Sequence, residues 1–225
     1  MGLLSGAALY RLMTFMSPAY PVGAFAWSGG LEWAIEAGDV RDAATLTDWL
    51  ATLTDCGSVG CDAALFCRAF RAAAGDDEGL AEVAELAAAL AGSRERFLET
   101  TAQGAAFLAI TRAAWPAPAL DRLAAAWDGP PAYPVAAAVA CAGHGIPLGP
   151  ALGAFLHALV SNLVSAGVRL VPLGQTDGQR VLSALEVPLA AAAARALSGD
   201  MAVAAVRADI ASMRHETQYT RLFRS

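Results

Sequence analysis

Apolar residues recur at every third or fourth position along most of the chain, which is the period of an amphipathic helix. Runs of β-branched residues are scarce, and Pro and Gly interrupt the periodic segments. The pattern predicts helices over residues 6–16, 28–37, 43–55, 61–74, 80–91, 94–114, 120–127, 135–143, 150–170, 176–185 and 189–197, and a last helix that begins near Asp200. The sequence is therefore predicted to be all-α.

Three local features refine these predictions. Four apolar side chains of the first helix share one stripe that is expected to face the core: Leu9, Leu12, Met13 and Met16. Asp42 is expected to be the N-cap of the helix over residues 43–55, because its carboxylate can accept a hydrogen bond from an unpaired backbone N–H. Glu32 and Glu36 lie one helical turn apart, a spacing typical of a solvated face.

The sequence contains no internal repeat, no linker and no break in composition. We therefore expect a single-domain bundle of roughly ten helices over residues 1–212. Residues 213–225 are expected to form a carboxyl-terminal tail that becomes ordered when a partner binds, because this segment combines interface-type side chains with a terminal position.

Composition narrows the chemistry that the chain can perform. Of its 225 residues, 55 are Ala, all 15 basic residues are Arg, and Lys is absent. Without Lys there is no P-loop lysine, no Schiff-base lysine and no Ser-Lys dyad. The net charge of −6 and the scattered Arg residues argue against binding to nucleic acid, which needs a clustered basic face. Any nucleotide chemistry is expected to belong to another chain.

An uncharged stretch raises the alternative of a membrane span. Hydrophobic residues make up 56% of the chain, and residues 129–168 contain no Asp, Glu or Arg. The window over residues 151–168 is long enough to be considered, but it carries His157, Ser161 and Asn162, which are costly in lipid. A buried central helix is the favoured interpretation, and no membrane partner is expected.

The expected compartment is the cytoplasm. The amino-terminal apolar stretch has no basic region ahead of it, as a secretory signal would have. The four cysteines are expected to stay reduced for the same reason: Cys56, Cys61, Cys67 and Cys141.

A metal site is the strongest chemical alternative. Cys141 and His144 are three residues apart and can share a helix face, and His157 is available nearby in sequence. No Cys-x-x-Cys pair is present, so the signature of structural zinc is missing and core packing is favoured for these residues. Transient contact with a soft or borderline metal stays open. No catalytic residue is assigned, because Ser28 lacks the leading Gly of a nucleophile elbow.

Three segments are not explained by a plain helical bundle. Residues 17–27 form an aromatic-rich loop between Pro and Gly residues, and residues 171–179 form a polar turn directly after the most apolar region. Residues 213–225 concentrate three Arg, one His and two aromatic residues at the end of an acidic protein.

These segments resemble the sequence motifs of the urease accessory protein UreF family, and they occur in the same order over nearly the full length. The residues that carry the resemblance are Pro21-Val22-Gly23-Ala24-Phe25 with Ser28-Gly29-Gly30-Leu31-Glu32, then Pro172-Leu173-Gly174-Gln175, then His215-Glu216-Thr217-Gln218-Tyr219-Thr220-Arg221-Leu222-Phe223-Arg224-Ser225. One departure is Thr220, where Ser is common in the family.

The resemblance implies an all-helical, non-enzymatic scaffold of urease maturation. Family members dimerise, bind UreD, called UreH in some organisms, and together with it recruit the GTPase UreG, which carries nickel to the urease apoprotein. The resemblance therefore implies a homodimer with these three partners. It also implies that no cofactor is bound permanently and that nickel is handled transiently. The alternative from the residues alone is a helical metal-binding protein that uses Cys141, His144 or His157.

The resemblance also implies which residues bind partners. The tail residues carried over to this role are Arg221, Leu222, Phe223 and Arg224. Tyr219 is added to them from its residue type, because aromatic side chains are typical interface anchors. The loop around Pro21, Gly23 and Phe25 is expected to neighbour the tail. Glu32 and Gln175 are expected on a polar surface that faces UreG or lines the dimer.

Overall fold

The computed structural model describes residues 4–201, 203 and 205–225. These residues form twelve α-helices and one 3-10 turn and contain no strand, which confirms the all-α prediction. The elements are α1 (Gly6–Phe15), η1 (Ala24–Ala26), α2 (Leu31–Glu36), α3 (Ala43–Asp55), α4 (Ser58–Ala72), α5 (Asp77–Ala89), α6 (Arg94–Ala114), α7 (Pro118–Ala126), α8 (Tyr133–Gly143), α9 (Leu148–Leu170), α10 (Gln175–Ala184), α11 (Glu186–Ser198) and α12 (Val206–His215).

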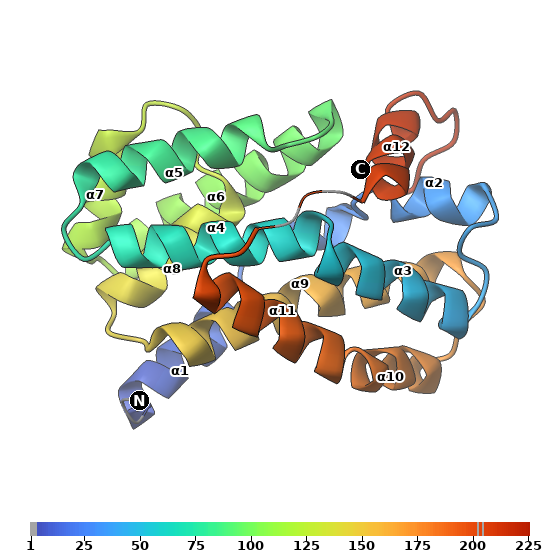
Figure 1. The fold of residues 1–225 in the computed structure, drawn as a ribbon, viewed down its shortest axis with the longest axis horizontal. Helices are drawn as coiled ribbons and strands as arrows, with labels where there is room; N and C mark the ends of the chain where they lie inside the picture. Colours follow the sequence, from blue (N-terminus) through green and yellow to red (C-terminus); the bar gives the residue numbers. More distant parts are fainter. Residues whose placement is uncertain (1–3, 202, 204) are drawn as a thin grey trace.

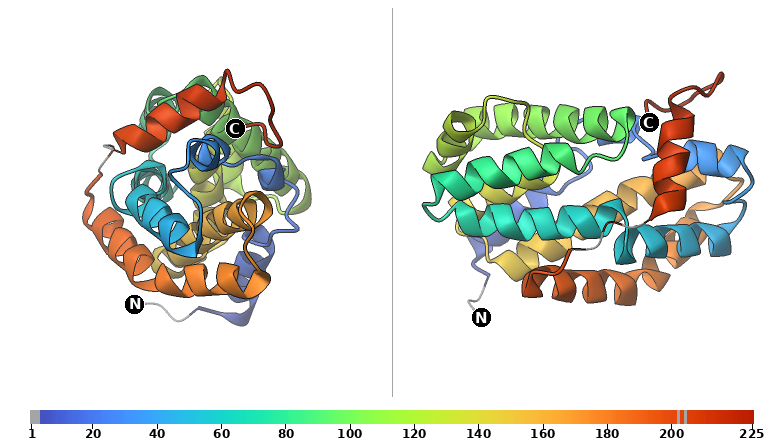
Figure 2. Two further views of the ribbon diagram at one scale, coloured as in Figure 1. Left: turned by 90° about the vertical axis from the view of Figure 1, so that its right-hand side faces the viewer. Right: turned by 45° about the horizontal axis from the view of Figure 1, so that its top comes forward.

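The helices surround α8, which packs mainly against α4 and α6. Figure 1 shows α4 and α5 side by side along the length of the molecule, with α10 and α11 along its lower edge. Both Figure 1 and the right-hand view of Figure 2 place α12 beside α2, at the end of the bundle opposite α7.

Side-chain caps explain why two predicted helices have the same bounds in the structure. Asp42 accepts a hydrogen bond from the Thr45 amide at 2.8 Å and begins α3, as predicted. Ser93 accepts one from the Arg96 amide at 3.0 Å and begins α6. The last helix begins at Val206 rather than near Asp200, and residues 202 and 204 lie outside the described part of the chain.

Many of the alanines lie in the core, where their small side chains allow helices to pack closely. All seven residues from Val135 to Cys141 on α8 are completely buried, and four of them are Ala. Small side chains let neighbouring helices approach closely on every side of α8, so a helix with no polar face can be buried all round. Gly104 on α6 contributes to this approach, since a Cβ there would overlap the backbone of the segment that leads into α8.

Four residues in and directly after α1 were predicted to face the core, and the prediction was wrong for two of them, Leu9 and Met13. The helix buries Ala8, Leu12 and Phe15, whereas Leu9 and Met13 are 44% and 67% exposed. Phe15 determines this orientation, because its ring packs edge-on against the rings of Tyr20, Phe107 and Trp115.

Helix α9 holds the uncharged stretch and is long and apolar enough to cross a membrane by length and composition. Half of its most apolar window is buried inside the bundle, where α9 contacts α3, α4, α10 and α11. This burial supports the interpretation of α9 as a central core helix.

Candidate functional site

The carboxyl-terminal tail packs along one end of the bundle. Helix α12 contacts α2 and α6, and residues 216–225 continue as a coil that returns to the loop before α2. The predicted division between residues 212 and 213 falls inside α12. In the single chain the tail is therefore docked on the body, and what a partner changes in it stays a prediction.

Gly30 allows α12 to lie against the start of α2. Its φ angle is 81°, in the left-handed region, and a Cβ at this position would lie 2.7 Å from the Ser212 backbone nitrogen. The Ser212 hydroxyl is hydrogen bonded to the Ser93 hydroxyl at 2.6 Å. Any side chain at residue 30 would push α12 away, which gives this glycine of the amino-terminal motif a structural role.

Three buried glutamates, Glu32, Glu95 and Glu99, receive the coil that follows α12. The Leu222 and Phe223 amides donate to the two carboxylate oxygens of Glu32 at 2.7 and 2.9 Å. The Arg221 guanidinium donates to Glu95 at 2.8 Å, and the Ser225 hydroxyl donates to Glu99 at 3.2 Å. Buried carboxylates need such partners, so the tail satisfies groups that would otherwise be costly to bury.

His215, the last residue of α12, is completely buried between two of these carboxylates. Its Nδ1 lies 2.6 Å from Glu95 Oε2, and its Nε2 lies 3.1 Å from Glu32 Oε2. The imidazole therefore joins α12 to both α2 and α6.

The end of the tail pairs with the amino-terminal motif. The Ser28 amide donates to the Ser225 carbonyl at 2.9 Å, and the Ser28 hydroxyl donates to the same oxygen. The Gly29 amide donates to the Ser225 hydroxyl at 3.1 Å, and the Arg224 amide donates to the Ala26 carbonyl at 2.8 Å. Two sequence motifs at opposite ends of the chain thus form one structural unit.

Arg169, near the carboxyl end of α9, contacts both the loop that contains Phe25 and the tail residue Phe223. Its guanidinium carbon lies 3.7 Å from the centre of the Phe25 ring and 4.3 Å from that of Phe223. It also donates a hydrogen bond to the Phe25 carbonyl at 3.1 Å. A planar cation between two rings is favourable, because the ring faces carry partial negative charge.

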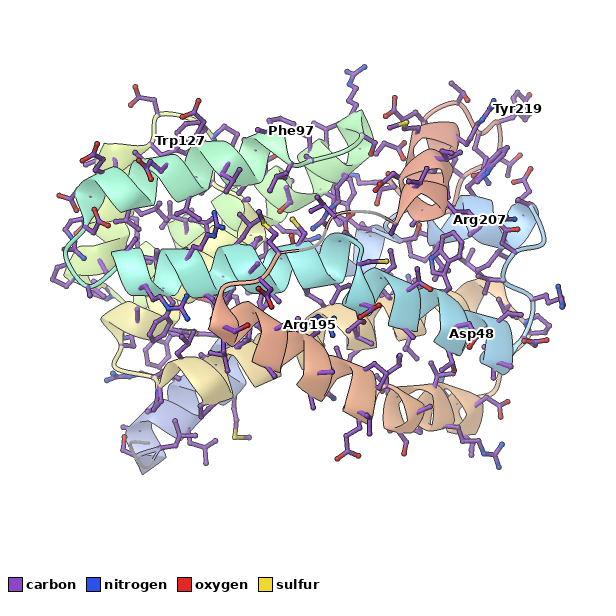
Figure 3. All side chains as sticks on the ribbon, in the orientation of Figure 1. Asp48, Phe97, Trp127, Arg195, Arg207 and Tyr219 are labelled. Atoms are coloured by element: carbon purple, nitrogen blue, oxygen red, sulfur yellow. The ribbon has the colours of Figure 1, made fainter. Side chains whose placement is uncertain are left out.

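The structure divides the partner-binding candidates into inward and outward side chains. Glu32 and Phe223 are buried, so the interpretation of Glu32 as part of a solvated face was wrong, although Glu36 is exposed as expected. Whether Glu32 contributes to a surface for UreG or for a second subunit stays a prediction. The burial of Glu32 depends on donors from a tail about 190 residues away in sequence. Tyr219, Leu222 and Phe25 are 102%, 74% and 68% exposed, and Figure 3 shows Tyr219 at the outer edge of the molecule.

The remaining partner-binding candidates are all exposed, but they lie on different parts of the structure. Pro21 and Gly23 are exposed in the loop that leads into η1, and Gly23 has a φ angle of 74°. Arg224 is exposed, with its guanidinium carbon 5.7 Å from the Trp27 ring centre. Gln175 is exposed as the first residue of α10, a helix that packs on α3, α9 and α11, so the structure does not bring it to the tail.

Sequence analysis missed four residues of this site: Glu95, Glu99, Arg169 and His215. His215 stands in a segment that the sequence does single out, but nothing local shows that its ring is buried. Glu95 and Glu99 lie one turn apart on α6 and have the spacing of an ordinary solvated pair. Their burial follows only from the tertiary contacts.

A buried ion pair lies beside the glutamate cluster and lines a cavity of about 270 Å³. Arg96 contacts Asp62 at 2.5 Å and Glu99 at 3.7 Å. Burial raises the pKa of both Asp62 and Glu99, and the nearby Arg96 guanidinium opposes that rise. Arg96 therefore helps to keep the carboxylates charged inside the bundle.

The three metal candidates do not form a site. Cys141 is completely buried, and burial raises the pKa of its thiol to about 12, so the thiolate that binds metals is disfavoured. His144 is hydrogen bonded to the Trp115 carbonyl at 3.0 Å, and burial lowers its pKa. His157 is exposed on α9 beside Ser161. Within the described ranges, no three His, Cys, Asp or Glu side chains are grouped so that they could hold a metal ion.

These features define the class of protein: an all-helical bundle whose carboxyl-terminal tail docks on buried carboxylates and presents apolar side chains outward. The sequence model of the UreF family matches residues 40–186. Two similar proteins are named urease accessory protein UreF. The one from Bradyrhizobium diazoefficiens is 60% identical, over 97% of this chain and 92% of its own length. The one from Rhodopseudomonas palustris strain BisA53 is 59% identical, over 97% of this chain and 94% of its own length.

The chain belongs to the UreF family of urease accessory proteins, as the motif resemblance predicted. A role in urease maturation follows from this membership. The family match ends before the tail, but the alignments with the two relatives cover nearly the whole chain.

Proposed function

We propose that this protein is a non-enzymatic scaffold of urease maturation in the cytoplasm. It dimerises, binds UreD (UreH), and with it recruits the GTPase UreG to the urease apoprotein. The docked tail and the loop around Phe25 provide the surface for UreD. The observation that carries this proposal is the pair of exposed side chains, Tyr219 and Leu222, on a backbone that buried glutamates hold in place.

The tail surface has the properties of a prepared binding site. Tyr219 and Leu222 make few contacts with their own chain, whereas the Leu222 and Phe223 amides are fixed on Glu32. A few side chains, most often Trp, Tyr and Arg, contribute most of the binding energy at protein interfaces. A backbone that is already ordered loses less conformational entropy when a partner binds.

Nickel enters this proposal as cargo. The protein binds no metal permanently, and contacts with nickel are transient within the assembled complex. Support comes from the chemistry of the thiols: burial raises the pKa of Cys61 and Cys141 to about 12 and that of Cys67 to about 11, so these three stay protonated near neutral pH.

The test is the affinity for purified UreD of a variant that combines Tyr219→Ala and Leu222→Ala. Both side chains point away from the body, so the helical content and melting temperature are expected to stay unchanged. The dissociation constant is expected to rise by at least about tenfold, because the variant removes two interface anchors.

The matched control is Val187→Ala, which removes a side chain that is 76% exposed on α11 and far from the tail in sequence. It is expected to bind UreD like the wild type. Equal binding by the double variant and the control would refute the tail assignment. A truncation after Ser212 is a less direct test, because it also removes the buried His215 and Phe223.

A further inference from the structure

A groove of about 740 Å³ runs between the tail and the first half of α6. Its apolar lining comes from Leu98 and Ala102 on α6, from Phe223 in the tail and from Trp27 in the loop before α2. Figure 1 and the right-hand view of Figure 2 place the C-terminal end of the chain beside the end of the bundle at which α6 begins. Leu98 is 44% exposed, so the groove presents apolar surface to solvent.

The charged lining of the groove is mostly basic. Arg94, Arg221 and Arg224 line it together with two glutamates, Glu95 and Glu216, so its formal charge is positive in a chain whose net charge is −6. Arg221 already donates to the buried Glu95 carboxylate at 2.8 Å. Within the described part of the chain, no carboxylate oxygen lies within 4.0 Å of the guanidinium of Arg94 or Arg224. These two groups are therefore available to a ligand.

The backbones of both available arginines are fixed. The Arg94 amide donates to the Glu216 carboxylate at 2.9 Å, and the Arg224 amide donates to the Ala26 carbonyl at 2.8 Å. The Arg224 guanidinium carbon lies 5.7 Å from the centre of the Trp27 ring, which is part of the same lining. A guanidinium group presents paired N–H donors that match the two oxygens of a carboxylate. The groove thus offers two such groups to an acidic ligand.

The combination of unpaired arginines and apolar walls selects the class of ligand. An inorganic anion would use the arginines but would leave Leu98 and Ala102 uncovered. A purely apolar segment would cover these two residues but would bury unpaired guanidinium groups, which is costly. A protein segment in which an apolar side chain lies between carboxylates satisfies both parts of the lining.

The groove is continuous with the tail surface. The coil over residues 216–225 contributes Arg221, Phe223 and Arg224 to the groove, and it also carries the exposed side chains of Tyr219 and Leu222. A partner that covers Tyr219 and Leu222 is therefore brought next to the groove.

We propose that the groove binds an extended acidic segment of the partner that docks on the tail, with carboxylates on Arg94 and Arg224 and an apolar side chain on Leu98 and Ala102. The inference rests on the proposed function, because it names the chemistry by which that partner, UreD, is recognised at the same surface.

The first experiment uses the full-length protein without UreD, and its probe is a short peptide of alternating Asp and Leu. In an NMR titration, the peptide is expected to shift the amide signals of Leu98 and Ala102 and the indole signal of Trp27. A peptide of alternating Asn and Leu is the matched control for the probe. It is expected to bind at least about tenfold more weakly, because it cannot form the charged pairs.

The second experiment measures UreD binding by a charge-reversal variant that combines Arg94→Glu and Arg224→Glu. Its dissociation constant for purified UreD is expected to rise by at least about tenfold, because like charges then meet in the groove. The association rate is also expected to depend less on salt than that of the wild type. A milder variant, Arg94→Gln with Arg224→Gln, is expected to lose less affinity than the charge-reversal variant.

Both variants are expected to fold, because residues 94 and 224 form their hydrogen bonds through backbone amides. Unchanged hydrogen-exchange protection of the Leu222 amide checks that the tail stays docked. The matched control combines Arg41→Glu and Arg68→Glu, which makes the same change in net charge at two exposed arginines outside the groove. This control is expected to bind both UreD and the acidic peptide as the wild type does.

Three results would overturn the inference. The first is equal binding of the Asp and Asn peptides, and the second is UreD binding by the charge-reversal variant that matches the control. The third is a change in the oligomeric state of the charge-reversal variant without UreD, because it would assign the groove to a second copy of this chain.

The two proposals can fail separately. Normal UreD binding by the variant with Tyr219→Ala and Leu222→Ala would refute the proposed function, and the peptide titration would still decide whether the groove binds acidic segments. Loss of UreD binding in that variant, together with wild-type binding by the charge-reversal variant, would refute only the further inference.

Discussion

Helix α8 and the docked tail are both buried against the rest of the protein, but α8 is held by apolar packing and the tail by hydrogen bonds to buried carboxylates. Residues Val135 to Cys141 of α8 are completely buried and are all small and apolar. The tail instead buries His215 against Glu32 and Glu95 and relies on hydrogen bonds between distant parts of the chain. Apolar packing in α8 needs only the right volume, whereas each buried carboxylate at the tail needs a particular donor.

Because of this difference, we expect the two regions to differ in the free energy that is needed to open them. Removing one donor or acceptor at the tail leaves a buried polar group unpaired, and opening the tail to water relieves that cost. The core has no comparable local way to open. We therefore expect the tail to detach at a lower free energy than the one that unfolds α8.

Phe155→Ala is expected to have the largest effect, and it acts on the core. The Phe155 ring is completely buried with its centre 4.8 Å from that of Phe66 and 5.4 Å from that of Tyr133. The cavity left behind should lower the free energy of unfolding by about 3–5 kcal/mol. Denaturant unfolding measures this. Val187→Ala, at an exposed valine on α11, should change it by less than about 0.5 kcal/mol.

Gly30→Ala compared with Gly38→Ala isolates the contact between α2 and α12. Both glycines have φ near 80°, so both variants carry backbone strain of about 1–3 kcal/mol. Only at residue 30 would the added Cβ meet the Ser212 backbone, since nothing lies within 4 Å at residue 38. Gly30→Ala alone should abolish the hydrogen-exchange protection of the tail, and equal protection in the two variants would contradict the described packing.

Glu32→Gln is expected to weaken the tail and spare the core. The amide keeps the shape of the side chain but has one acceptor oxygen for two backbone donors. The free energy of tail opening should fall by about 1–3 kcal/mol, while unfolding of the core is nearly unchanged. Hydrogen exchange measures the first quantity and denaturant unfolding the second. Glu82→Gln, on an exposed position of α5, should alter neither.

Arg169→Lys is expected to have the smallest effect. Lysine keeps the charge but loses the planar group between the Phe25 and Phe223 rings, which should weaken tail docking by about 0.5–1 kcal/mol. The same exchange experiment can detect this loss. Arg41→Lys at an exposed arginine serves as the control, and a loss of equal size there would show that the stacking contributes nothing.

The sequence allowed much of the fold to be predicted. Asp42 and its helix over residues 43–55 were predicted because a cap and a periodic apolar face are local signals. The orientation of α1 was not, because Leu9 and Met13 on one stripe compete with Ala8 and Phe15 on another. Only the aromatic cluster around Phe15 decides between them, and its members come from distant segments.

The candidate site was harder to predict than the fold. The motifs identified the tail and the loop, and the structure joins them through Ser28 and Ser225. Glu32 looked like a solvated residue because its spacing from Glu36 is that of an exposed helix face. Whether a carboxylate is buried depends on donors that arrive from elsewhere in the chain, here from Leu222 and Phe223.

The most direct test of this account is hydrogen exchange in the isolated, full-length chain at neutral pH, read at two places. The account predicts that the Leu222 and Phe223 amides exchange at least about tenfold more slowly than in an unstructured peptide. It also predicts that they become exposed at a lower denaturant concentration than the α8 amides. Exchange of the two tail amides at the rate of the unstructured peptide would contradict the account, because it would mean that Glu32 does not hold the tail.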